Sequence, residues 1–363
     1  MFSLKKKFNK GEWSELYATL KILSSNRIKG CRNFGLKYTF GNTDVYYVKE
    51  EDSDVIKMIV DGKVKKLFSI LEIVILLKDF YKTLIETKAS SFTMPNKIEN
   101  LIDDLELWGF KAPSQTKRDL TLFTFDNNEY KEYGCSVKSQ LGQAYDIQSG
   151  SGKNLMAEVE ISNISSFDAN IAEQKFGTKI LTKFAFLYNQ NQSYYKFNRF
   201  YNEDFNNSLE KISAHYGYEK NFLQQVLLLC LEYYINAKCA GKKGKYTYAN
   251  ALESLKENNP LYIDNINDYE DILNHYFIEC QTHLNGVYWN KDEKEDVTQF
   301  LTVLKDGSID IKDLSEYKED LSKVKFDRSS ASRGDKRIPI KMGVITPMEN
   351  KFFLYYPMQI RHA

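Results

Sequence analysis

Residues 132–142, EYGCSVKSQLG, contain side chains that can do chemistry. The alternation of this stretch predicts a β-strand with Ser136, Lys138 and Gln140 on one face and with cysteine and valine on the other. A packed core would place an apolar side chain where Lys138 stands. The stretch therefore predicts either a strand exposed to water or a strand whose lysine acts on a substrate.

A carboxylate is expected to lie close to this lysine. Residues 118–125, RDLTLFTF, read as a second strand that is joined to the first by a turn of Asp and Asn residues. A β-hairpin over 118–138 brings Asp119 back towards Lys138. This pair suits metal-assisted hydrolysis of a phosphodiester, because the carboxylate holds Mg²⁺, which polarises the phosphoryl oxygen and lowers the pKa of a bound water. The lysine would orient that water or offset charge on the phosphate.

Two further oxygen ligands can complete such a metal site. Glu15 lies on a predicted helix over residues 11–24 and would supply a second carboxylate, while the main-chain carbonyl of Val137 would supply another oxygen. The simpler alternative is that the aspartate and the lysine are ordinary solvated residues on strand surfaces, since short motifs of this kind have many false matches. Spacing alone leaves both interpretations open.

The surrounding pattern alternates between strands and helices, which indicates an α/β fold. Residues 34–68 alternate in polarity and contain Gly-Asn and Asp-Gly turns, which are typical of short antiparallel strands. Residues 167–305 are mostly helical by pattern, and Pro357 favours an edge or a bulge for the last predicted strand, 351–361. Further helices are predicted at 69–87 and 97–110, and a further strand at 155–162.

These elements predict one α/β core with a helical second lobe. Residues 1–165 would form the core, with the first helix and the hairpin. Residues 166–305 would form the mainly helical lobe, and residues 306–363 a basic segment and a final strand that returns to the core.

Composition narrows the class of protein. The 363 residues carry 50 basic and 49 acidic side chains, a balance that excludes a non-specific nucleic-acid coat protein but allows a local basic groove. No apolar run approaches the roughly 18 residues of a membrane helix. The five cysteines are scattered and form no CxxC pair, which fits a reducing cytoplasm.

Three blocks of the sequence resemble the HpaII family of type II restriction endonucleases. In the family's order, they are FNKGEWSELYATLKIL (8–23), DLTLFTF with GCSVKSQLG (119–125 and 134–142), and FFLYYPMQIR (352–361). The resemblance implies a PD-(D/E)xK nuclease core, which is a mixed sheet flanked by helices, and a Mg²⁺ cofactor. It also implies cleavage of double-stranded DNA at a short palindrome, with 5′-CCGG-3′ as the family's namesake target, and a DNA methyltransferase as genetic companion.

The catalytic motif carries over with two departures. Asp119 matches the first carboxylate of the family's motif, Lys138 matches its lysine, and Glu15 matches the acid on the first helix. Arg118 replaces the proline before the aspartate, and Ser136 occupies the catalytic position of the second acid. The missing acid would then come from elsewhere. The candidates that remain open are, in order, Glu15, Glu12, and either Glu158 or Glu160.

Reading a DNA sequence requires contacts to base edges, and arginine is the usual donor to guanine. Gln140 shares the face of the lysine and would reach a base edge or a phosphate near the cut. The alternative for the basic cluster is a flexible surface loop; with the resemblance, we expect it to contact DNA. This cluster consists of Arg328, Arg333, Lys336 and Arg337.

The sequence thus predicts a cytoplasmic, Mg²⁺-dependent, site-specific endonuclease. A homodimer is the natural way to cut both strands of a palindrome, although a monomer that nicks each strand in turn is also compatible. Two rival functions remain. One is a repair or junction nuclease that recognises DNA structure, and the other is a DNA-binding module that has lost catalysis.

Overall fold

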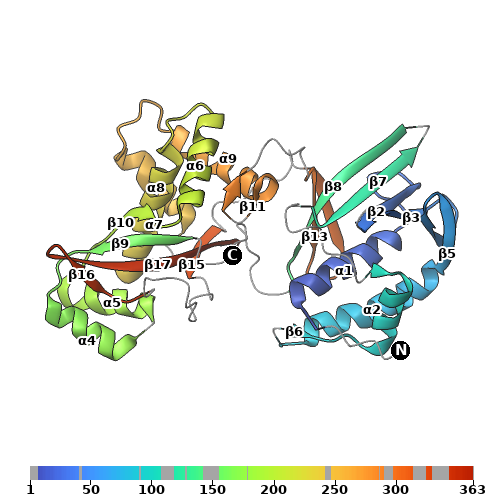
Figure 1. The fold of residues 1–363 in the computed structure, drawn as a ribbon, viewed down its shortest axis with the longest axis horizontal. Coiled ribbons are helices and arrows are strands. Elements are labelled where there is room, and N and C mark those ends of the chain that lie inside the picture. Colours follow the sequence, from blue (N-terminus) through green and yellow to red (C-terminus); the bar gives the residue numbers. More distant parts are fainter. Residues whose placement is uncertain are drawn as a thin grey trace. The chain divides into compact units, whose positions relative to one another are not determined.

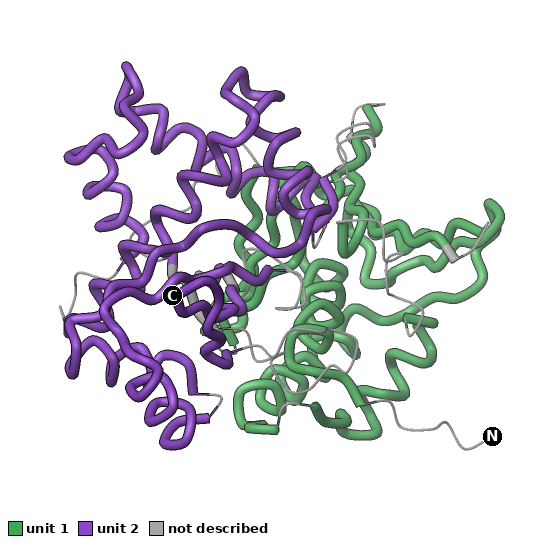
Figure 2. The backbone as a smooth tube through the Cα atoms, turned by 60° about the vertical axis from the view of Figure 1, so that its left-hand side comes forward, with its two compact units in different colours: residues 1–145, 292–317 green, residues 146–291, 318–363 purple. Residues whose placement is uncertain are grey.

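The computed structural model divides the chain into two compact units (Figure 2). The first contains residues 1–145 and 292–317, and the second contains residues 146–291 and 318–363. Each unit has its own sheet and its own apolar core. The residues that the structure describes are 7–40, 43–89, 91–107, 118–126, 129–141, 155–177, 179–241, 247–285, 287–289, 297–313, 324–328 and 343–362.

The first unit is built on an eight-stranded mixed sheet with helices packed against it (Figure 1). Its strand order is β14-β13-β8-β7-β2-β3-β4-β5, and only the β13–β8 pair is parallel. The strands are β2 (Phe34–Phe40), β3 (Thr43–Lys49), β4 (Val55–Val60), β5 (Lys63–Ser69), β7 (Leu120–Asp126), β8 (Glu129–Ser139), β13 (Gln299–Val303) and β14 (Ile309–Asp313). The helices are α1 (Lys10–Leu23), α2 (Ile70–Glu86) and α3 (Asn96–Asp104), and two short strands, β1 (Phe8–Asn9) and β6 (Ser91–Phe92), pair separately.

Helix α1 is the predicted first helix, and it is fixed at both its start and its buried face. It begins with a capping box formed by Asn9 and Glu12. Trp13 is fully buried, and its indole nitrogen donates to the Phe92 carbonyl at 3.0 Å. The helix packs against α2 and against strands β8 and β13 of the sheet. The apolar stripe therefore brings α1 onto the strands that carry the candidate site.

The second unit contains a smaller sheet with helices on it. Its path is β10-β9-β17-β15, with β16 attached to β17, and all of these pairs are antiparallel. The strands are β9 (Met156–Ile161), β10 (Tyr195–Phe200), β15 (Val324–Arg328), β16 (Thr346–Met348) and β17 (Lys351–His362), with a small hairpin of β11 (Leu284–Asn285) and β12 (Tyr288–Trp289). The helices are α4 (Ser166–Phe176), α5 (Ile180–Asn191), α6 (Glu203–His215), α7 (Phe222–Cys239), α8 (Tyr248–Asn258) and α9 (Asp268–Thr282).

The last strand differs from its prediction, because β17 lies inside its sheet and not at an edge. Its first part pairs with β9 as far as Pro357 opposite Met156, and its pairing with β15 begins one residue later, at Met358. Met358 donates its N–H to the Leu155 carbonyl, towards β9, so the main-chain groups of the preceding residue, Pro357, point towards the β15 edge. Proline has no N–H to donate, and Pro357 lies one residue before the pairing with β15 begins.

The units also divide the chain differently from the expected boundaries. Strands β9 and β17 were expected in the nuclease core, but they pair with each other in the second unit. The segment that returns to the first sheet is instead β13 with β14. The apolar strand β13, QFLTV, lies parallel to β8 and covers the edge that β7 leaves open. None of the described helices is long and apolar enough to cross a membrane.

Candidate active site

Asp119 lies immediately before β7 and turns its carboxylate onto β8. Its main-chain N–H donates to the Cys135 carbonyl at 2.8 Å. Its carboxylate oxygen Oδ2 accepts a hydrogen bond of 2.6 Å from the N–H of Val137 and one of 3.2 Å from the hydroxyl of Ser136. The predicted hairpin is therefore present, and it joins the aspartate to the stretch that contains the lysine.

The strand register explains why this aspartate reaches the neighbouring main chain. Leu120 is opposite Cys135, so a continued ladder would set Asp119 opposite Ser136 and Arg118 opposite Val137. The ladder ends instead, and the Asp119 side chain takes the N–H of Val137. The N–H and the C=O of one residue in an extended strand point to the same edge. The Val137 carbonyl is therefore expected on the side of Asp119, where a carboxylate and a carbonyl are both ligands for a hard cation.

Lys138 lies on a strand that is fixed by β13 along one edge and by the core on its opposite face. It lies two residues after Ser136, so the two side chains share a face roughly 7 Å apart along the strand. Its main chain pairs with Thr302 of β13, and its side chain is half-buried. The opposite face of β8 is packed into the core through Cys135 and Val137, as the sequence predicts. A lysine on such a rigid strand is well placed to act on a fixed phosphate.

Glu15 is half-buried on α1, the helix that packs against β8 and β13. Burial raises the pKa of the Tyr38 phenol well above its usual range, and the charges of Cys135 and Glu15 raise it further. Burial also raises the pKa of the Cys135 thiol to about 12, with a further contribution from the charge of Asp119. Both carboxylates are thus within electrostatic reach of one small region of the core around Cys135.

Glu12 has a structural role at the start of α1. Its carboxylate accepts the N–H of Asn9 at 3.0 Å, and its own N–H donates to the Asn9 side chain at 2.9 Å. This reciprocal pair satisfies main-chain donors that have no partner inside the helix. The arrangement favours Glu15 over Glu12 as the acid that α1 supplies to a metal.

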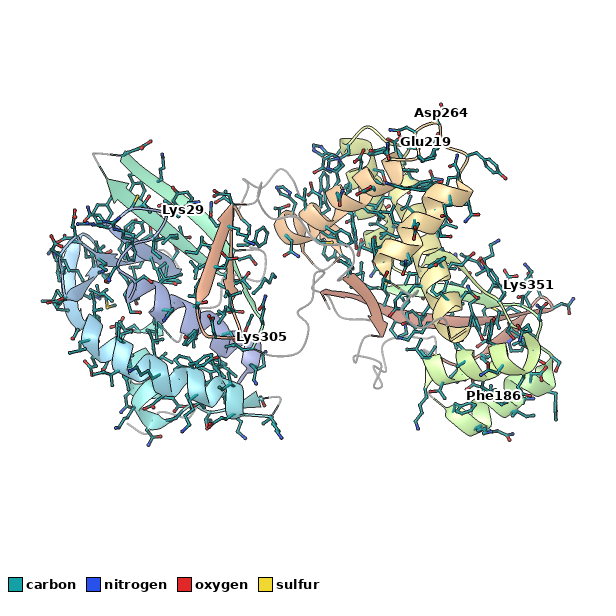
Figure 3. The ribbon with its side chains drawn as sticks, turned by 180° about the vertical axis from the view of Figure 1, so that it is seen from behind. Lys29, Phe186, Glu219, Asp264, Lys305 and Lys351 are labelled. Atoms are coloured by element: carbon teal, nitrogen blue, oxygen red, sulfur yellow. The ribbon has the colours of Figure 1, made fainter. Side chains whose placement is uncertain are left out.

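The other two candidate acids lie in the second unit, and each has a basic partner there. Glu158 is buried and accepts from Arg199 at 3.1 Å and from the Tyr355 hydroxyl at 3.2 Å. Glu160 pairs with Lys351 at 2.9 Å. Lys351 lies at the start of β17 (Figure 3). The hydrogen bond from Lys351 lowers the pKa of Glu160. Each acid is therefore paired with a basic side chain from its own sheet.

Among the residues that the structure describes, no three or more His, Cys, Asp or Glu side chains cluster as a metal site. Two carboxylates and a main-chain carbonyl remain as a donor set. Magnesium keeps several waters and is commonly bound by only one or two carboxylates together with substrate phosphates. The chemistry of Asp119, Glu15 and the Val137 carbonyl fits that requirement.

The predicted DNA-contacting residues are only partly described. Gln140 is exposed just after β8, and its N–H donates to the Val303 carbonyl at 2.9 Å. The main chain of Arg328 ends β15, opposite Met358, but its side chain lies outside the described residues. The rest of the cluster, Arg333, Lys336 and Arg337, also lies outside them.

Sequence reasoning missed Thr302, which is the direct partner of Lys138 on β13 and lies on the same face. The signal was present but short, because QFLTV is a five-residue apolar run far along the chain from the hairpin. A buried parallel strand typically appears in the sequence as such a short apolar run, and periodicity does not show which strand it pairs with.

Comparison with known proteins adds one family. The family model described as HpaII restriction endonuclease matches residues 9–361, which is nearly the whole chain. No curated protein and no solved structure matches the chain. The match includes α1, the hairpin of β7 and β8, and all but the last residue of the final strand β17.

Proposed function

Because the chain belongs to the HpaII restriction endonuclease family, we propose that it is a type II enzyme that cuts double-stranded DNA at a short palindrome and depends on Mg²⁺. The proposal includes a PD-(D/E)xK core in the first unit. One observation carries it: Asp119 is hydrogen-bonded to β8 beside Ser136, on the strand face that also holds Lys138. The family's namesake site, 5′-CCGG-3′, is the first target to test.

The proposed division of labour follows from the positions of the groups. Asp119, Glu15 and the Val137 carbonyl would hold the metal ion, which would polarise the phosphoryl oxygen and lower the pKa of a water. Lys138 orients that water and offsets negative charge on the scissile phosphate. Ser136 replaces the second acid of the motif and instead steadies the Asp119 carboxylate through its hydroxyl.

DNA reading is assigned to two parts of the chain. Gln140 follows the strand of Lys138, so it is proposed to contact the nucleotides next to the cut. Arginine recognises guanine through two parallel hydrogen bonds, which supports the basic segment as the base reader at a G·C-rich site. Its members are Arg328, Arg333, Lys336 and Arg337. A methyltransferase that protects the same site is the expected companion in the cytoplasm.

A digest of unmethylated plasmid DNA tests the proposal. Discrete fragments with Mg²⁺ and intact DNA with EDTA are expected, and sequencing of the ends identifies the site. A nuclease that recognises DNA structure would leave intact duplex uncut. Ser136 at the acid position favours one rival, a DNA-binding module without catalysis, which would bind the plasmid but leave it uncut with Mg²⁺.

A further inference from the structure

The face of the sheet that holds Lys138 continues onto β13 and β14. The ladder between β8 and β7 does not reach the level of Lys138, because its nearest pair is Leu120 with Cys135. Among the described strands, the sheet beside the lysine therefore consists of β13, which lies next to β8 (Figure 1), and then β14. Lys138 is opposite Thr302 of β13, and Thr302 is opposite Asp310 of β14. Directly paired residues point to the same face, so these three side chains form one row.

This row lies on the side of the sheet that faces away from the apolar core. The alternate residues of the same two strands, Leu301, Val303 and Ile311, contribute to the core of the first unit. The residues of the row, Thr302 and Asp310, are instead partly exposed. The polar surface that begins at Lys138 thus extends across two more strands.

Lys312 adds a cation to this surface. It lies two residues after Asp310 on β14, and its ammonium nitrogen pairs with the Asp310 carboxylate at 3.3 Å, as expected for side chains on one face of a strand. Lys37 lies on the same face of the sheet but is held by two carboxylates, Asp44 and Glu132, and its side chain is only 23% exposed. The side chain of Lys312 is 52% exposed and pairs with one carboxylate among the described residues. Lys312 is therefore more open to a further anion.

The spacing of the strands suits the backbone of a DNA strand. Strands in a sheet are roughly 4.8 Å apart, so β14 lies about 10 Å from β8. In a duplex, the phosphates of one strand follow each other at ~3.4 Å along the axis. A DNA strand that has its scissile phosphate at Lys138 and crosses β13 therefore brings another phosphate, about three nucleotides away, over β14. There Lys312 can exchange the Asp310 carboxylate for the phosphate, because an exposed ion pair contributes little to stability.

We propose that Thr302 and Lys312 contact the backbone of the DNA strand that is cut. Lys312 binds the phosphate over β14, and Thr302 donates its hydroxyl to the backbone between that phosphate and the cut. We call these two residues the β13–β14 track. Ammonium and hydroxyl groups are usual partners of phosphate oxygens, and such contacts position the duplex without reading its sequence. The inference rests on the proposed function, because it takes the place of the cut from Lys138.

The test is equilibrium binding of the full chain to a short duplex over a series of salt concentrations, with EDTA in place of Mg²⁺ so that no DNA is cut. Each phosphate that a lysine neutralises contributes about 0.9 to the slope of log K against log salt concentration. Lys312→Met should therefore weaken binding and lower the magnitude of this slope by about 0.9. Lys312→Arg keeps the charge and should keep the slope.

Lys63→Met is the matched control for the lost charge. Lys63 is an exposed lysine on β5, the opposite edge strand of the same sheet. It is opposite the core residue Val60, so it points to the other face of the sheet. The Lys63→Met variant should bind the duplex with the affinity and the salt slope of wild type.

Two substitutions separate the hydroxyl and the competing acid from the charge of Lys312. Thr302→Val removes the hydroxyl but keeps the branched shape, so it should weaken binding with no change in the salt slope. Asp310→Asn removes the carboxylate that competes with the phosphate, so it should strengthen binding. A side chain that only stabilises the sheet would not produce these opposite effects.

Three results would each overturn the proposal: an unchanged slope in Lys312→Met, an equal loss in Lys63→Met, or weaker binding by Asp310→Asn. The test also separates this contact from the proposed nuclease. If the chain cuts plasmid DNA with Mg²⁺ but Lys312→Met keeps the wild-type slope, the nuclease stands and the β13–β14 track is wrong. If Lys312→Met lowers the slope in a chain that never cuts, the track stands and the nuclease is wrong.

Discussion

At the scale of single residues, the Asp119 carboxylate has a structural task as well as a proposed chemical one. It accepts the N–H of Val137, which the strand ladder leaves without a main-chain partner. An asparagine can still accept this hydrogen bond through its carbonyl oxygen but carries no charge. Asp119→Asn therefore separates the two tasks, because the hairpin is kept while the charge proposed to hold a cation is lost.

The two acids of α1 should respond to substitution in opposite ways. Glu12→Ala removes half of a capping box and should lower the free energy of unfolding by about 1 kcal/mol with little change in cleavage. Glu15→Ala should leave stability nearly unchanged and slow cleavage about 100-fold, because a carboxylate that holds the metal contributes several kcal/mol in the transition state. Urea unfolding and single-turnover cleavage measure the two effects. If Glu12→Ala cleaved DNA slowly and Glu15→Ala cleaved it at the wild-type rate, Glu12 would be the metal ligand in place of Glu15.

At the scale of elements, the local pattern was sufficient wherever the partner lies close in sequence. The stripe of α1 and the alternation of β7 and β8 predicted these elements, and with the turn between the strands they predicted that Asp119 meets β8. The pairing of β13 with β8 joins residues more than 160 positions apart, and a short parallel strand has no turn to indicate its neighbour. Strand β17 is antiparallel to its neighbours, but its pairing with β9 joins residues more than 190 positions apart, so no local signal indicated its central position.

Close packing between β2 and β7 supports the strand that follows Asp119. Gly35 pairs with Phe123 on one side and Val48 on the other, and a Cβ atom at this position would collide with the Tyr47 carbonyl and the Phe123 ring. Gly35→Ala should therefore lower the free energy of unfolding by about 1–3 kcal/mol. Thermal unfolding measures this loss. A variant that melts like wild type would mean that β2 and β7 separate more easily than the structure indicates.

At the scale of the whole molecule, the chain passes from the first unit to the second, returns to add β13 and β14, and leaves again. Neither unit is a continuous piece of sequence, so the sheet around Lys138 needs both its early and its late strands. The second unit has its own stabilising centre at Glu279, which is buried and accepts from Tyr216 and Trp289 at 2.6 Å each and contacts His283 at 2.7 Å.

This centre predicts how the second unit responds to acid. Burial alone raises the pKa of Glu279, but the hydrogen bonds from His283, Tyr216 and Trp289 outweigh it, so the pKa lies below its ordinary value of 4.5. A lowered pKa in the folded state means that the stabilisation is present above pH 4.5 and is lost as the pH falls through the folded value. Glu279→Gln should therefore be less stable than wild type at pH 7 and should lose less stability on acidification. Urea unfolding at a series of pH values measures both slopes, and parallel slopes would contradict the prediction.

The central claim is that Asp119 and Lys138 form the catalytic site of a site-specific nuclease, and single-turnover cleavage of a short duplex carrying the mapped site tests it most directly. Wild type should cut with Mg²⁺, and Asp119→Asn and Lys138→Met should each be slower by at least about 100-fold while still binding the duplex. Lys131→Met is the matched control, because Lys131 is an exposed lysine near the other end of β8. It should cut like wild type. Normal cleavage by Asp119→Asn and Lys138→Met would contradict the account.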